Sequence, residues 1–154
     1  MTRPSINRRV LALGALVLAL QLVALLNPDV PMRDFEERYA GGHALALLDA
    51  ARGGPWALQY RPFCGGCVLV SGLAAGLFAA LPDVMMVWKL VPIGFTALLV
   101  AVVVWRLRPV AAGVTLLALA FPPTAWLHLS LMGWGNHAES GVFVAVAVLL
   151  LWGD

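Results

Sequence analysis

Long apolar stretches separated by short charged segments are the feature that most limits what this chain can fold into. Residues 10–26, 85–105 and 110–128 are each about as long as a helix that crosses a bilayer, which needs roughly 17–25 residues. Apolar residues make up 62% of the chain and charged residues 12%, whereas a soluble domain carries about 25% charged residues. The sequence therefore predicts an all-α, polytopic membrane helix bundle.

The charged residues are sorted between the segments that connect these stretches. Arginines without acids occupy two segments (Arg3, Arg8, Arg9, Arg106 and Arg108), and most acids occupy the other two (Asp29, Asp34, Glu36, Glu37, Asp49, Asp83 and Glu139). Short cytoplasmic loops retain Lys and Arg, so we expect a cytoplasmic N-terminus and extracytoplasmic acids. The short loops fit a bacterial inner membrane. The small net charge of +2 argues against a nucleic-acid partner.

One transmembrane domain covers residues 1–154 in this interpretation, with spans at 10–26, 85–105, 110–128 and 141–152 and an external loop at 27–84. Residues 10–26 could also belong to a cleaved signal peptide, but signal peptides end in small residues after a shorter apolar region. The last span is short, because a helix rises only about 1.5 Å per residue and the hydrocarbon core is about 30 Å thick. The sequence thus predicts an incomplete domain, the N-terminal fragment of a longer protein.

Two helices are expected within the external loop. The first covers 34–52 as an amphipathic surface helix, with Asp34 as N-cap, Glu37 as its capping-box partner and a Gly-Gly-Pro stop after Arg52. The second covers 67–81 as a juxtamembrane or half-inserted helix, since a full span there would place Arg106 and Arg108 outside. Its Gly72 and Gly76 form a small-xxx-small pair suited to close packing on a neighbouring helix.

Carboxylates in two external segments could carry chemistry. Asp34, Glu36 and Glu37 could provide a general base, or they could simply form the solvated start of the surface helix. Glu139 follows Asn136 and His137 at the start of the last span. Asn136 and Glu139 could form a capping box, but His137 and Glu139 beside a membrane are costly unless they face a wet cavity.

Cysteines and cations supply the remaining candidates. Cys64 and Cys67 are the two cysteines of the chain, and their C-x-x-C spacing allows a redox-active disulfide, a structural disulfide or free thiols. Arg61 and Lys89 are cations near the predicted outer face. Lys89 lies one turn into a span, where it could snorkel to the headgroups or bind a lipid-linked phosphate.

The order of these features resembles the N-terminal part of the GT-C-type membrane glycosyltransferases, which use polyprenyl-phosphate-linked sugars. The pieces that carry the resemblance are RDFEERYA (33–40), LQYRPFCGGC (58–67), WKLVP (88–92) and GWGNHAES (133–140). The layout covers most of the chain, although Phe35 occupies a position where that family commonly has an aspartate. The resemblance implies an extracytoplasmic sugar transfer from a lipid-linked donor.

Carried onto this sequence, the resemblance makes Glu36 or Glu37 the catalytic base, with Asp34 as a further candidate. It makes Glu139 the second acid, which positions the acceptor or a divalent metal ion. Arg61 and Lys89 then hold the phosphate, and Tyr39, Asn136 and His137 are further candidate substrate-binding residues. The implied partners are membrane lipid, the lipid-linked donor and either the missing C-terminal half or another membrane subunit. Two other functions stay open: a membrane thiol-disulfide oxidoreductase that uses Cys64 and Cys67, and a non-catalytic membrane subunit.

Overall fold

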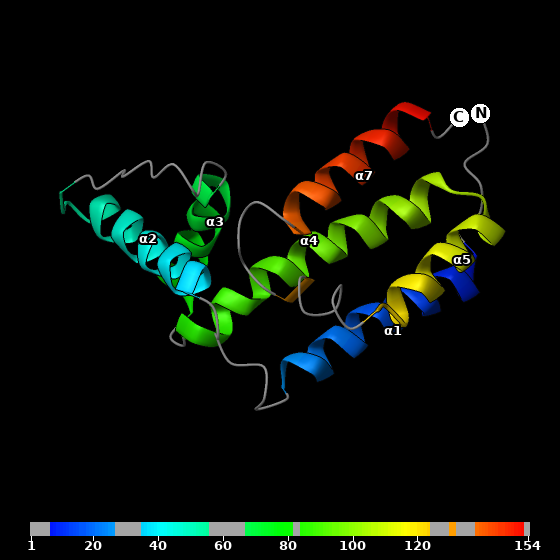
Figure 1. Cartoon of the computed structure of the whole chain (residues 1–154), viewed down its shortest axis with the longest axis horizontal. Coiled ribbons are helices and arrows are strands. Elements are labelled where there is room, and N and C mark those ends of the chain that lie inside the picture. Colours follow the sequence, from blue (N-terminus) through cyan, green and yellow to red (C-terminus); the bar gives the residue numbers. More distant parts are fainter. Residues whose placement is uncertain are drawn as a thin grey trace.

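The regular secondary structure in the described part of the chain is all helical. The computed structural model describes residues 7–26, 35–55, 67–81, 84–123, 130–131 and 138–152, and no strand occurs among them. The helices are α1 (Arg8–Leu25), α2 (Phe35–Ala51), α3 (Cys67–Ala80), α4 (Val84–Arg106), α5 (Pro109–Ala120) and α7 (Ala138–Trp152), as Figure 1 shows. The predicted all-α class is confirmed.

Two of these helices are long and apolar enough to cross a membrane. They are Arg8–Leu25 and, within α4, Val87–Arg106. The apolar helices Leu69–Ala80, Pro109–Ala120 and Glu139–Leu151 are shorter. The described structure therefore supplies two candidate spans, and the polytopic arrangement stays a prediction.

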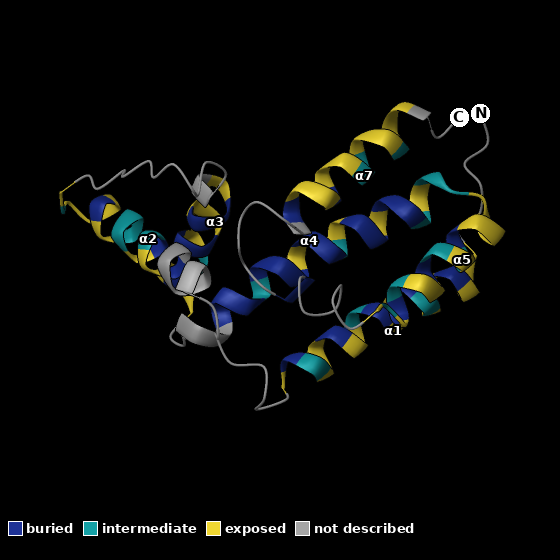
Figure 2. Ribbon diagram, in the orientation of Figure 1, coloured by how far each residue is buried: buried dark blue, intermediate teal, exposed yellow. Residues whose placement is uncertain are grey.

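Helix α4 forms the centre of the bundle. It packs against α1, α3, α5 and α7, and Figure 2 shows it largely buried while α1 and α7 keep exposed outer faces. Pro92 lies inside α4. Because proline has no backbone N–H, the carbonyl of Trp88, four residues earlier, loses its helical donor. The largest buried side chain of the core, Trp88, lies in this same part of α4.

Helix α1 passes close to α4 at Gly14. A Cβ atom added to Gly14 would lie 2.8 Å from Cγ1 of Val100 and 3.8 Å from Cγ2 of Val104. Real Cβ atoms almost never come within 3.0 Å of another heavy atom, so only glycine fits this crossing without a shift of the valine.

We expect Gly14→Leu to lower the free energy of unfolding by about 1–3 kcal/mol or more, because it overpacks the contact between α1 and α4. The matched control is Gly42→Leu in α2, where an added Cβ meets nothing within 4 Å. That control should be neutral or stabilising by up to about 1 kcal/mol, since leucine is the better helix former. Thermal unfolding of both variants in detergent measures the difference. Equal stability of the two would contradict the close crossing.

Helices α2 and α3 pack on each other, and α3 also packs on α4. Figure 1 shows this pair at the end of the bundle away from the chain's N-terminus. The expected stop after Arg52 matches the local backbone: α2 ends at Ala51, and Gly53 adopts a φ of 98°. Glycine reaches this left-handed conformation without steric cost.

The predicted packing role of Gly72 and Gly76 is not seen within the described residues. Helix α3 buries Val70, Ser71 and Ala74, and Gly72 and Gly76 are exposed, with nothing within 4 Å of an added Cβ. Gly76 lines an open groove between α3 and α4, and the closer contacts of α3 involve its buried residues, such as Val70, Ala74 and Phe78.

Helix α5 ends within the predicted span 110–128, where the Pro122-Pro123 pair favours a kink or a break. Its last residue is Ala120, and Phe121 leaves the helical conformation with φ −123° and ψ 60°. The physical reason is the Pro122-Pro123 pair, which supplies no N–H donors to continue the helix. Residues 124–129 lie outside the described part of the chain.

Candidate functional site

Buried polar side chains gather in one part of the otherwise apolar bundle. The described residues that are both polar and buried are Gln21, Ser71, Lys89, Thr96, Ser130 and Glu139. Ser71 lies on α3. The other five come from α1, α4, the pair Ser130–Leu131 and the start of α7, and they lie near that pair. A polar group inside an apolar bundle is expensive and is therefore a candidate site.

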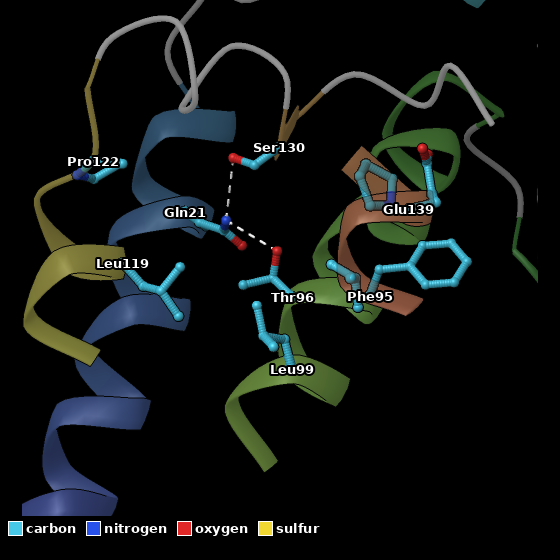
Figure 3. Close-up of a pocket in the computed structure, with 10 residues that line it drawn as sticks. Gln21, Phe95, Thr96, Leu99, Leu119, Pro122, Ser130 and Glu139 are labelled. Carbon is cyan, nitrogen blue, oxygen red and sulfur yellow. Dashed lines mark hydrogen bonds between the residues drawn. The ribbon is translucent and has the colours of Figure 1, made fainter. Parts of the chain in front are cut away.

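Gln21 of α1 links two of the hydroxyl groups (Figure 3). Its Nε2 donates to Thr96 Oγ1 at 3.2 Å and to Ser130 Oγ at 3.4 Å. Its Oε1 is buried and has no hydrogen-bond partner among the described residues. The cavity beside it measures about 10 Å³, which is about the space that one water molecule needs. This part of the site can therefore accommodate a single hydrating water.

Lys89 of α4 points into the bundle rather than along its surface. Only 4% of the residue is exposed, and its Nζ donates to the carbonyl oxygen of Leu131 at 3.2 Å. Lys89 and Thr96 are seven residues apart, so they share a face of α4 and lie about 10 Å apart along the helix axis. The sequence allowed Lys89 either to snorkel to the headgroups or to bind a phosphate. Its buried position does not fit a side chain that snorkels.

Glu139 lies in the first turn of α7 and is 2% exposed. It lines the same cavity as Gln21 and Ser130. In Figure 3 its carboxylate points away from Gln21, Thr96 and Ser130, toward the end of the bundle where α1 finishes. Its carboxylate therefore lies at the positive end of the α7 dipole.

The remaining predicted site residues cannot be placed in this cluster. Asp34, Arg61, Cys64, Asn136 and His137 lie outside the described residues. Glu36, Glu37 and Tyr39 lie in α2, and Cys67 begins α3, but their side chains are outside the described part. Of the predicted site residues, the structure thus places Lys89 and Glu139 in the buried polar cluster.

A metal site is not formed by the described residues. No group of three or more His, Cys, Asp or Glu side chains comes together among them, and Glu139 contributes a single carboxylate. The divalent ion implied by the resemblance therefore has no complete ligand set in the described part of the chain, and no chemical step is assigned to it.

Three members of the cluster were missed in the sequence: Gln21, Thr96 and Ser130. A signal for two of them was present. Gln21 interrupts the apolar stretch 10–26, and Thr96 lies within the stretch 85–105, two helical turns after Lys89. Polar side chains inside a spanning helix usually face the bundle interior, so their position could have predicted an interhelical contact.

Comparison of the chain with protein-family models, with curated proteins and with solved structures finds no match.

Proposed function

We propose that this chain is embedded in a membrane, with α1 and α4 crossing it. The outer faces of the bundle support the proposal, because large apolar side chains are exposed along α1 and α7 (Leu11, Leu16, Leu20, Leu22, Val23, Phe143, Val144, Val148, Leu150 and Leu151). Extended exposed apolar surfaces are rare on soluble monomers. Lipid hydrocarbon is the solvent that suits them.

Within the membrane, the proposed function is sugar transfer from a polyprenyl-phosphate carrier to an acceptor on the extracytoplasmic face, as in the GT-C-type glycosyltransferases. The observation that carries this proposal is the burial of two opposite charges, Lys89 and Glu139, in the cluster around Ser130 and Leu131. Ionisable residues inside membrane bundles are costly and mark substrate or ion sites. A phosphate-linked substrate needs a cation, and an acceptor hydroxyl needs a carboxylate.

The chemistry would proceed as an inverting displacement. A carboxylate of the first external segment, Glu36 or Glu37, takes the proton from the acceptor hydroxyl. The hydroxyl oxygen forms a bond to the anomeric carbon while the bond from that carbon to the phosphate oxygen breaks. The polyprenyl phosphate leaves with the bonding electrons, and Lys89 together with Arg61 stabilises its charge. Glu139 orients the acceptor.

Substitution of Lys89 should change the KM for the donor more than it changes the stability of the fold. We expect Lys89→Met to raise the KM for the lipid-linked donor by about tenfold or more, because it removes a charge-assisted contact worth about 1.5–3 kcal/mol. The assay is transfer by the purified full chain in proteoliposomes. Arg52→Met, which removes an exposed cation in the turn after α2, is the control. A lowered melting temperature with an unchanged KM would show that Lys89 is only structural.

A non-catalytic membrane subunit is the second candidate, and the exposed Gly72 and Gly76 favour it. A helix face that carries glycines four residues apart allows close packing against a helix of another protein. Gly72→Leu together with Gly76→Leu would abolish co-purification of a partner without unfolding the chain.

A thiol-disulfide oxidoreductase is a further alternative, for which the reduction potential of Cys64 and Cys67 is the deciding measurement.

A further inference from the structure

The end of the bundle opposite to Lys89 and Glu139 carries a concentration of arginines. Arg8 and Arg9 lie in the first turn of α1, and both are exposed. Arg106 ends α4, and Arg108 lies exposed in the turn before α5. Figure 1 shows the start of α1 and the turn between α4 and α5 at the same end of the molecule.

Packing of the apolar neighbours holds the two arginine segments together. Val10 belongs to the same core cluster as Val103, and Leu107 packs against that cluster. One turn further along α1, Gly14 lies against Val100. The arginines therefore share one surface, although they come from segments far apart in the sequence.

This surface is named here the arginine end (Arg8, Arg9, Arg106 and Arg108). The acids in the described helices belong to α2 and to the first turn of α7 (Glu36, Glu37, Asp49 and Glu139), which lie toward the other end. Helices α1 and α5 begin at the arginine end and α4 and α7 end there, so the helix dipoles oppose one another and the positive charge of this surface comes from the arginines themselves.

Arg106 contacts both α7 and a neighbouring tryptophan at this surface. Arg106 donates from Nε to the carbonyl oxygen of Leu149 and from Nη2 to that of Leu150, both at 3.2 Å, which joins α4 to the last turns of α7. The guanidinium of Arg106 lies 5.5 Å from the ring centre of Trp105, which is 66% exposed. An exposed tryptophan beside arginines is typical of the headgroup level of a membrane.

We propose that the arginine end binds the phosphate groups of anionic phospholipids. The proposal rests on the membrane embedding proposed above, but not on sugar transfer. Each Arg near an anionic membrane surface strengthens binding by about fivefold. The arginine end therefore selects phosphatidylglycerol-type lipids over zwitterionic ones and holds this end of the bundle at the anionic leaflet.

The test uses the full chain in nanodiscs made from phosphatidylcholine with a minority of phosphatidylglycerol. Native mass spectrometry of the released protein counts the lipids of each class that stay bound. Wild-type protein should retain phosphatidylglycerol above its share in the disc. Arg8→Gln, Arg9→Gln and Arg108→Gln combined should lower this enrichment by at least about tenfold, and the fold should persist because all three side chains are exposed.

Three further measurements make the result decisive. Arg52→Gln, which removes an exposed arginine in the turn after α2, should leave the enrichment unchanged, and Arg→Lys at the three positions should retain most of it. High salt should reduce it, because the screening length falls from about 10 Å at 0.1 M to about 3 Å at 1 M. If the wild-type protein enters the discs but retains no excess of phosphatidylglycerol, the lipid-binding proposal is wrong and the membrane embedding stands. The same holds if Arg52→Gln loses as much enrichment as the triple variant. Protein that does not enter the discs overturns the membrane embedding as well.

Discussion

Trp88→Ala should lower the free energy of unfolding by about 3–5 kcal/mol, the usual cost of truncating a large core aromatic residue. Trp88 is fully buried in α4, and its ring centre lies 6.4 Å from that of Phe78 on α3. It joins the α2–α3 pair to the central helix, and alanine would leave a cavity at this junction. Thermal or denaturant unfolding in detergent, followed by circular dichroism, measures the loss.

Trp105→Ala is the matched control, because Trp105 lies on the same helix and is 66% exposed. Its contact with Arg106 is exposed, and such cation–π contacts contribute about 0.5–1 kcal/mol. The control should therefore lose no more than about 1 kcal/mol. If both tryptophans cost the same, the core around Trp88 is not packed as described.

Glu139→Gln should reduce sugar transfer by about 10²–10³-fold, because it removes a preorganised charge from a water-poor site where charge interactions are strong. Glutamine has nearly the same shape as glutamate and keeps the side chain polar, so the fold should persist. The loss is expected mainly in kcat, since a residue that orients the acceptor acts in the transition state. Transfer from a polyprenyl-phosphate sugar in proteoliposomes gives both kinetic constants.

Asp49→Asn serves as the control for Glu139→Gln, because Asp49 is an exposed acid of α2. It should keep wild-type activity. Unchanged transfer in Glu139→Gln would remove Glu139 from the proposed site. A loss of activity that accompanies a large fall in melting temperature would assign Glu139 to stability and contradict its proposed role.

The helical class and most helix positions could be predicted from the sequence, because apolar stretches and breakers act locally. The stop after Arg52 needs a residue that adopts positive φ, which Gly53 supplies. The Pro122-Pro123 pair within the predicted span 110–128 predicts a kink or a break, and α5 ends there at Ala120. A proline pair can bend or end a helix, and its neighbours in the sequence do not decide which.

Side-chain partners across helices could not be predicted, because they depend on how the helices rotate against each other. The sequence placed Lys89 near the outer face, but it could not show that its Nζ donates to the carbonyl of Leu131. The contact from Gln21 to Thr96 joins residues 75 positions apart. The sequence also does not show which glycines lie at helix contacts. Gly14 lies at a close helix crossing, while Gly72 and Gly76, the small-xxx-small pair, are exposed.

The sidedness of the bundle is the claim on which the proposed function depends, and cysteine labelling tests it most directly. The native cysteines are replaced by serine, and single cysteines are introduced at Arg108, at Arg52 and at Ser140, all of which are exposed. A membrane-impermeant maleimide should label Arg52→Cys and Ser140→Cys in intact cells and should label Arg108→Cys only after permeabilisation. Labelling of Arg108→Cys from the same side as Ser140→Cys would contradict the separation of the arginine end from the proposed site.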